Sequence, residues 1–410
     1  MAGRSLRRTA LFTVVPTLLF ITSIPLHCLG GEISTQGIYY PNCNRICELR
    51  TTVTVNEYFD LTPWLSIGLG GGLRGLLSTR EFAPSAEDFI VDENYIHIHF
   101  NSLSAKLGYL RETWGKLDQI SPLDILNPIE VSSAFLDCEK EQAKIPIPMS
   151  VFSVYFSDTL TFKLSLIPFF EKSVYDDLEE DSSPYNVVEF PLPLEEQVPE
   201  KAIGNVEFGT GVFLTLRETD CALYYFRGFQ DFPAYRIENI LPPTKIFAQY
   251  PLIHMLGLDF ETVVDRWGIR GECSLLFGEG YQRTSEINYI EANALTSGIG
   301  LDTSYADNYF NASVLYRTIF VTESIEEEKN EISITANFEK RIAYDTVEVD
   351  FLGMYNVFSG SIYGKATLSV SPIDNFWISS AISVFEGESG DYLGRFRDKD
   401  AYYLELVYNF

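Results

Sequence analysis

Apolar and polar residues alternate with a period of two along most of the chain. The pattern is clearest in residues 401–410, where aromatic and aliphatic side chains occupy every second position. Successive side chains of a β-strand point to opposite faces, so this segment is predicted to be a strand with two different faces. The positions on its apolar face are Tyr402, Leu404, Leu406, Tyr408 and Phe410.

The same pattern predicts eighteen strands, most of them 10 to 18 residues long. Strands of globular proteins average about 5–6 residues, whereas a tilted strand needs about 9–11 residues to cross a bilayer. The length therefore favours a membrane barrel over a soluble sandwich. The predicted strands are 32–41, 46–59, 64–77, 89–101, 103–114, 145–157, 159–171, 203–217, 219–230, 247–264, 267–278, 285–300, 303–320, 330–343, 345–358, 361–371, 374–386 and 398–410.

The connections between these strands alternate between short and long, except that 42–45 and 359–360 are short on the outer side. This alternation is typical of barrels with short periplasmic turns and longer outer loops. We therefore predict an all-β, antiparallel up-and-down transmembrane barrel of about 18 strands (16–18), forming one domain over residues 32–410. The short connections lie near 60–63, 102, 158, 218, 265–266, 301–302, 344 and 372–373; the long ones are 78–88, 115–144, 172–202, 231–246, 279–284, 321–329 and 387–397.

Residues 1–31 differ from the rest of the chain. Three arginines within the first eight residues precede a mostly apolar run, 11–26, which is followed by small residues near 28–30. This order is that of a secretory signal peptide. The alternative is a membrane anchor, but two prolines interrupt the run, which is shorter than the roughly 20 apolar residues of a spanning helix. We expect cleavage within 28–32 and delivery to the Gram-negative outer membrane.

Composition excludes several kinds of protein. Lys and Arg number 30 and Asp and Glu 57, which gives a formal net charge of −27 and disfavours nucleic-acid binding. Aromatic residues make up 14%, which is typical of a folded chain. Only 4 His and 6 Cys are present, so we expect neither metals nor other cofactors. Cys43 and Cys47 are close enough in sequence to form a disulfide, but their spacing alone does not decide whether they do.

Two stretches resemble known outer-membrane proteins. The last strand, with Tyr408 and Phe410, resembles the assembly signal of Gram-negative outer-membrane barrels and implies recognition by the barrel assembly machinery. Residues 103–171, with a strand ending in Trp114-Gly115, then Asn127-Pro128, then Pro146-Ile147-Pro148-Met149, resemble a porin-like family of uncharacterised function. This family is similar to alginate-export barrels and is often described beside exporters of the RND/MMPL type. The resemblance implies outer-membrane lipid and an inner-membrane exporter as partners, and brings no catalytic residues.

The connection 115–144 is long, yet it is not simply hydrophilic. Its aliphatic residues recur at roughly helical spacing, and Asn127-Pro128 would end a short helix. We expect the segment to fold into the channel and constrict it; the alternative is an apolar loop packed on neighbouring loops. The candidate lumen or constriction residues are Trp114, Asp118, Asp124, Asn127 and Glu130, with Asp259, Glu261, Glu348 and Asp350 on the barrel wall.

Several chemical alternatives accompany this prediction. His97 and His99 share a strand face, but metal sites usually need three or more ligands. Asp259 and Glu261 also share a face and could act as an acid–base pair, although acidic side chains are common in channel interiors.

On strand 345–358, alternation predicts that Val349 and Phe351 face lipid and that Glu348 and Asp350 face water. The four tryptophans are predicted to lie in interfacial aromatic girdles, with packing in a core as the alternative; they are Trp64, Trp114, Trp267 and Trp377.

The function that these features favour is a porin-like channel or export-associated barrel for passive passage of small polar or lipid-like solutes. We expect no enzymatic activity. The alternative is a structural or adhesive surface barrel with a plugged lumen. Conductance would separate the two.

Overall fold

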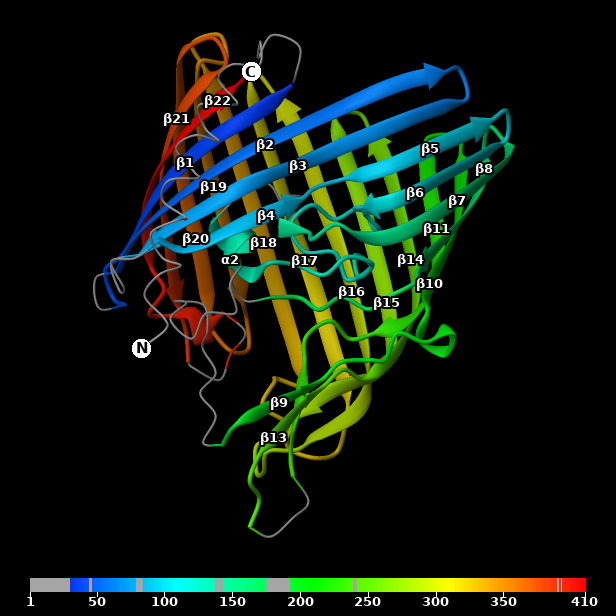
Figure 1. Cartoon of the computed structure of the whole chain (residues 1–410), viewed down its shortest axis with the longest axis vertical. Coiled ribbons are helices and arrows are strands. Elements are labelled where there is room, and N and C mark those ends of the chain that lie inside the picture. Colours follow the sequence, from blue (N-terminus) through cyan, green and yellow to red (C-terminus); the bar gives the residue numbers. More distant parts are fainter. Residues whose placement is uncertain are drawn as a thin grey trace, which may run out of the picture.

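One antiparallel sheet closes on itself to form a barrel (Figure 1). Closure follows from β1, which pairs with β2 on one side and with β22 on the other. Because β4 and β5 pair in succession with β3, they fill one place, and the 19-stranded sheet forms an 18-strand barrel. This confirms the predicted fold. The computed structural model describes residues 30–43, 46–78, 84–136, 143–174, 192–238, 242–388, 391 and 393–410; the predicted signal peptide lies almost wholly outside them.

Every predicted strand corresponds to one strand position of the barrel. No helix among the described residues is long and apolar enough to cross a membrane. The barrel strands are β1 (Gly31–Tyr40), β2 (Ile46–Thr62), β3 (Leu65–Ser78), β4 (Pro84–Val91), β5 (Asn94–Phe100), β6 (Leu103–Leu110), β7 (Ile147–Ser157), β8 (Leu160–Ile167), β10 (Glu207–Leu216), β11 (Thr219–Phe229), β14 (Leu252–Val264), β15 (Trp267–Gln282), β16 (Tyr289–Tyr305), β17 (Asn308–Phe320), β18 (Asn330–Ile342), β19 (Val347–Asn356), β20 (Ile362–Ile373), β21 (Phe376–Glu386) and β22 (Ala401–Asn409).

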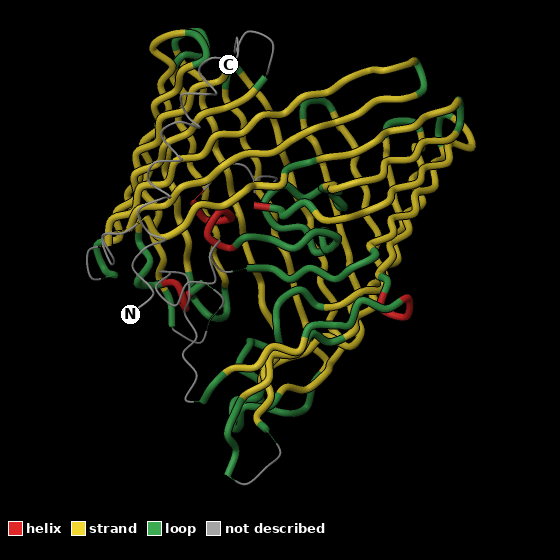
Figure 2. The backbone as a smooth tube through the Cα atoms, in the orientation of Figure 1, coloured by secondary structure: helices red, strands yellow, loops and turns green. Residues whose placement is uncertain are grey.

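The two rims of the barrel differ (Figure 2). Short turns, the start of β1 and the end of β22 share one rim, which we name the short-turn rim; the described parts of the long connections leave from the other rim. A small sheet of β9 (Leu194–Gln197), β12 (Ala234–Ile237) and β13 (Ile246–Gln249) belongs to the long connections. The short helices are α2 (Val131–Leu136), η2 (Ile203–Asn205) and η3 (Gly394–Phe396).

One predicted turn was wrong by several residues. The turn expected at 301–302 lies at Ala306 and Asp307, whose φ angles are +47° and +61°. Such left-handed pairs match the twist of a tight hairpin. Asp302, which suggested a turn, is an inward-facing strand residue that pairs with Arg270 at 3.3 Å. Strand β16 therefore continues to Tyr305.

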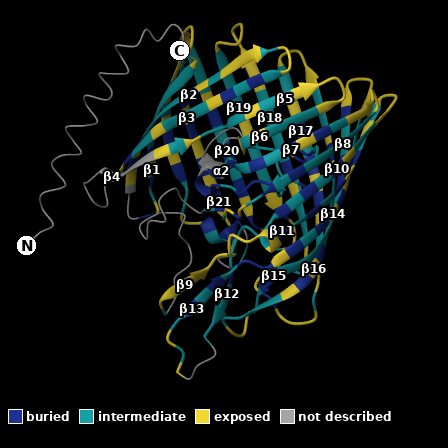
Figure 3. Ribbon diagram, turned by 45° about the vertical axis from the view of Figure 1, so that its right-hand side comes forward, coloured by how far each residue is buried: buried dark blue, intermediate teal, exposed yellow. Residues whose placement is uncertain are grey.

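The wall has an apolar outer face and an inner face with both polar and buried apolar side chains, and burial alternates along its strands (Figure 3). On β22, Leu404 is 53% exposed on the outer face, whereas Tyr403 is 3% exposed on the inner face. On β19, Phe351 is 50% exposed and belongs to the outer face. Its neighbours Asp350 and Leu352 point inward, in accordance with the alternation expected from the sequence.

This sidedness predicts different outcomes for two matched substitutions on β19. Phe351→Arg places a charge on the lipid-facing wall and should destabilise the barrel by about 2–4 kcal/mol if it lies near the membrane midplane. Glu348→Arg changes an inward side chain that is 33% exposed, and should assemble nearly normally. The measurement is the fraction of each variant that shows heat-modifiable migration. Equal fractions would contradict the assignment of the faces.

The aromatic residues at the short-turn rim only partly match the predicted girdle. Trp64 and Trp267 are exposed there, and Trp64 stacks on Phe100 with ring centroids 5.4 Å apart. Trp377 occupies an inward register position on β21. Trp114 does not belong to a girdle, because it lies inside the barrel and is 2% exposed. Tryptophan suits both a lipid interface and an apolar core, so residue type alone did not separate these cases.

Cys43 lies in the connection between β1 and β2 and is buried. Its thiol is free and donates a hydrogen bond to the carbonyl of Asp398 at 3.0 Å. The structure therefore contains no Cys43–Cys47 bridge.

Candidate channel constriction

The connection between β6 and β7 folds into the barrel, as predicted (Figure 1). We call its described part, residues 111–136 and 143–146, the inward segment. Leu117, Leu123 and Leu126 are at most 4% exposed, because they pack against the inner face of the wall. The expected helix before Pro128 is wrong: residues 111–130 are irregular, and α2 begins at Val131. Contacts between individual residues of the segment and the wall hold this part of the backbone in place instead.

Glycines on the wall allow the apolar side chains to approach closely. A Cβ atom at Gly209 of β10 would lie 2.5 Å from the ring of Trp114, and one at Gly300 of β16 would lie 2.7 Å from Leu117. Trp114 also packs against Tyr224, with ring centroids 4.8 Å apart. Glycine in a strand often marks such a close approach. The wall is therefore shaped to receive the segment.

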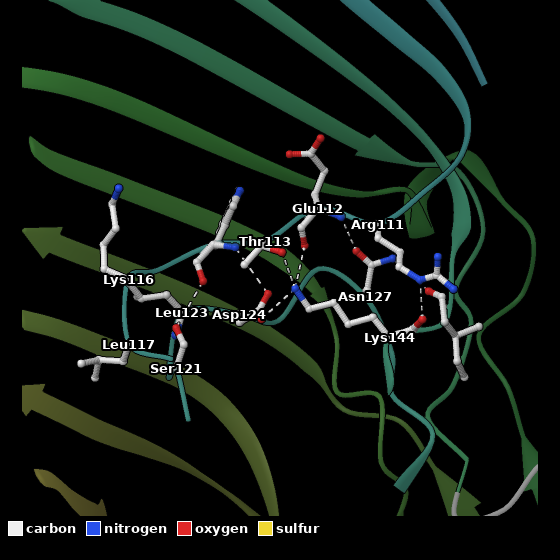
Figure 4. Close-up of polar contacts among 12 residues, drawn as sticks. Arg111, Glu112, Thr113, Lys116, Leu117, Ser121, Leu123, Asp124, Asn127 and Lys144 are labelled. Carbon is white, nitrogen blue, oxygen red and sulfur yellow. Dashed lines mark hydrogen bonds and ion pairs between the residues drawn. The ribbon is translucent and has the colours of Figure 1, made fainter. Parts of the chain in front are cut away.

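Glu272 of β15 attaches the segment to the wall. Its carboxylate accepts hydrogen bonds from the backbone N–H groups of Lys116 and Leu117, the latter at 2.5 Å, and from the hydroxyl of Ser121 at 2.6 Å. Figure 4 shows Lys116, Leu117 and Ser121 along one bend of the segment. Glu272 is 3% exposed, so these donors replace the water that a carboxylate otherwise binds.

Asp118 makes a second attachment. Its carboxylate pairs with Arg270 of β15 at 2.5 Å, and accepts hydrogen bonds from Tyr309 at 2.8 Å and Asn311 at 2.5 Å, both on β17. Arg270 also pairs with Glu261 at 2.9 Å. One bend of the segment is therefore joined to two wall strands by charged and polar groups.

The base of the segment is closed by its own polar side chains. Lys144 pairs with Asp124 at 2.9 Å and donates to the hydroxyl of Thr113 at 2.6 Å (Figure 4). Asn127 accepts a hydrogen bond from the backbone N–H of Glu112 at 2.9 Å. The Asn127 amide also donates to two carbonyls, at 2.9 and 3.0 Å. With three such bonds, Asn127 fixes the shape of the segment rather than facing open solvent.

Helix α2 reaches a different part of the wall. Phe135 packs against Tyr363 of β20, Phe385 of β21 and Phe396 of η3, with ring centroids 5.2, 5.0 and 5.1 Å away. The hydroxyl of Tyr363 donates to the carbonyl of Phe135 at 2.6 Å. Between these attachments, Glu130 pairs with Arg74 of β3 at 3.3 Å. The segment therefore contacts widely separated strands and crosses the barrel interior.

The two acids that share the inner face of β14 bind different partners. Asp259 is 2% exposed and accepts a hydrogen bond from the hydroxyl of Tyr224 at 2.7 Å. Glu261 is more accessible and pairs with Lys116 at 3.2 Å as well as with Arg270. Each carboxylate is thus bound by partners of its own.

The acids predicted on β19 line the inner face away from these attachments. Glu348 lies 3.7 Å from Arg341 of β18. Asp350 stands directly across from Glu339 of β18, and that register row continues to Tyr309, which binds Asp118. Asp350 therefore lies on the inner face two strands away from an attachment of the inward segment.

Several residues that hold the segment were not singled out from the sequence. Arg270 and Glu272 occupy the polar face of a predicted strand, and this alternation was the only signal that they carried. No sequence pattern indicated a role for Lys144 or Arg74, because their partners Asp124 and Glu130 are distant in the chain.

The two histidines lie on the inner face of β5. Their rings are 5.4 Å apart, and His97 shares a hydrogen bond with the hydroxyl of Ser104 at 2.8 Å. Within the described ranges, no group of three or more His, Cys, Asp or Glu side chains is arranged to hold a metal ion.

No protein-family model matches the sequence, and no curated protein sequence matches it either. Solved structures match the fold. OccAB4 of Acinetobacter baumannii has a TM-score of 0.53 at 8% identity, over 93% of this chain and 97% of that chain. OccAB3 of the same species has a TM-score of 0.52 at 9% identity, over 93% and 99%. The outer membrane protein opdK of Pseudomonas aeruginosa has a TM-score of 0.52 at 8% identity, over 93% and 98%. The chain thus has the barrel fold that the sequence resemblance implied.

Proposed function

We propose that the protein is a porin-like channel of the Gram-negative outer membrane, through which small polar solutes pass passively. The observation that carries this proposal is the closed 18-strand barrel crossed by an inward segment. Barrels of 16–18 strands are wide enough to hold an aqueous channel. The inward segment reduces that width and so sets which solutes pass.

The location in the outer membrane has two supports. One is the lipid-compatible outer wall, and the other is the likeness to a solved protein whose name places it in the outer membrane. The proposal includes insertion by the barrel assembly machinery through the last strand. Tyr408 faces outward on that strand, and the backbone of Phe410 pairs with Gly31 at 2.9 and 3.0 Å.

A conductance measurement tests the proposal. The purified protein in a planar bilayer should give discrete single-channel steps. A structural barrel with a plugged lumen is the second candidate, because Phe135 and Trp114 bury the segment against the wall. A correctly folded barrel that gives no conductance would favour the plug.

We propose a channel rather than an enzyme because the most suggestive acids already have partners. Asp259 binds Tyr224, and Glu261 binds Arg270 and Lys116. Their contacts explain why charged groups stand on the inner wall without requiring a reaction.

The channel should prefer cations weakly. Glu339 and Glu348 remain 24% and 33% exposed in the lumen, where both lie near Arg341. Acidic clefts concentrate counterions, and salt screens this effect over about 10 Å at 0.1 M. Reversal potentials under a salt gradient should therefore favour cations, and less so at high salt. Glu339→Gln combined with Glu348→Gln should lower the preference, whereas anion selectivity of the unmodified channel would contradict it.

A further inference from the structure

Arg266 stands in the turn between β14 and β15, at the short-turn rim. Its guanidinium carbon lies 5.8 Å from the ring centroid of Trp267 and 5.7 Å from that of Tyr305. Both rings are on the lipid-facing side, where Trp267 is 38% and Tyr305 69% exposed. Aromatic faces attract and orient a guanidinium group. An exposed cation is therefore held between two rings on the outside of the barrel.

The backbone at this turn is fixed to the next strand. The hydroxyl of Thr303 on β16 donates to the carbonyl of Arg266 at 2.9 Å. Other arginines of the wall, such as Arg270 and Arg317, pair with carboxylates. In the described part of the chain, no carboxylate forms an ion pair with Arg266. Its charge is thus presented outward and not neutralised by the protein.

The surface beside Arg266 is apolar. Val264 of β14 and Leu301 of β16 are 52% and 44% exposed on the outer face. A ligand that fits this place has an anionic group at the rim and an apolar part along the wall. A phospholipid has both.

We infer that Arg266, with Trp267 and Tyr305, binds the phosphate of a phospholipid headgroup, and that the acyl chains of this lipid lie against Val264 and Leu301. This inference rests on the proposed function, because the short turns of an outer-membrane barrel lie at the periplasmic leaflet. Arginine binds phosphate through charge-assisted hydrogen bonds, and tryptophan and tyrosine suit the boundary between headgroups and acyl chains.

Native mass spectrometry of the full chain in mild detergent, titrated with phosphatidylglycerol, tests the site. Arg266→Gln should weaken binding of the first lipid about tenfold, since a hydrogen bond to a charged group is lost. Arg266→Lys should weaken it less, because the charge remains without the planar fork. The matched control is Arg217→Gln in the β10–β11 turn, whose side chain contacts no aromatic ring among the described residues. Arg217→Gln should bind lipid like the unmodified protein.

Competition by inorganic phosphate and substitution of the two aromatic rings test the ligand and the site further. Inorganic phosphate, which has no acyl chains, should not displace the lipid at equal concentration. Trp267→Leu and Tyr305→Leu keep the charge and should each weaken binding about two- to fivefold through the lost ring contact. Displacement by inorganic phosphate would overturn the lipid assignment. Equal binding by the unmodified protein and correctly folded Arg266→Gln, or an equal loss in Arg217→Gln, would overturn the site.

Conductance separates this inference from the proposed function. Arg266→Gln should conduct normally, because the residue lies outside the lumen. A protein that binds lipid through Arg266 but never conducts would overturn the channel and leave the lipid site standing.

Discussion

Replacing residues 116–123 with two glycines should raise the single-channel conductance at least about twofold, because an 18-strand barrel without this bend has a wider aqueous path. The new ends are close together, since the backbone N–H of Trp114 lies 3.4 Å from the Asp124 carboxylate. The replacement keeps Asp124 and Asn127, which close the base of the segment, and α2 remains attached through Phe135. The measurement is conductance in planar bilayers under symmetric salt.

The replacement has a matched control outside the barrel. Shortening Leu194–Gln197 removes exposed residues of the small sheet at the long-loop rim and should leave conductance near that of the unmodified protein. Heat-modifiable migration should show that both variants are closed barrels. Unchanged conductance in a closed replacement variant would show that ions do not pass beside residues 116–123.

The barrel could be predicted because each strand carries its own evidence. A strand with one face toward lipid and one toward water must alternate, and Phe351 and Asp350 show the consequence. Turn positions were less certain, because an inward acid such as Asp302 resembles a turn residue in sequence. Its identity as a strand residue depends on Arg270, which stands on the neighbouring strand.

The constriction could be predicted only in outline. The leucines of the inward segment required an apolar surface, and this requirement favoured an inward fold. No local pattern could reveal which part of the wall they meet, because Leu117 and Trp114 approach the wall at glycines, which carry no apolar signal. The same holds for Asp118, whose three partners lie more than 150 positions along the chain.

Loss of the Glu272 carboxylate should release the bend of the inward segment without opening the barrel. Glu272→Ala leaves the N–H groups of Lys116 and Leu117 and the hydroxyl of Ser121 without their acceptor. Removing one partner of a buried hydrogen bond costs about 1–3 kcal/mol, so losing this shared acceptor should destabilise the docked state by at least that amount. The open channel should become noisier and more conductive on average, because the segment then exchanges between docked and undocked states.

Two variants calibrate this effect. Glu272→Gln keeps one carbonyl acceptor and should fall between the unmodified protein and Glu272→Ala. Glu348→Ala removes an inward acid of β19 that pairs with Arg341 rather than with the segment, and it should leave the open-channel noise unchanged. Current fluctuations and the temperature of heat-modifiable unfolding measure the two consequences. Current noise and an unfolding temperature of Glu272→Ala equal to those of the unmodified protein would contradict this prediction. They would show that the apolar contacts of the segment, such as Leu117 against Gly300, hold it without the carboxylate.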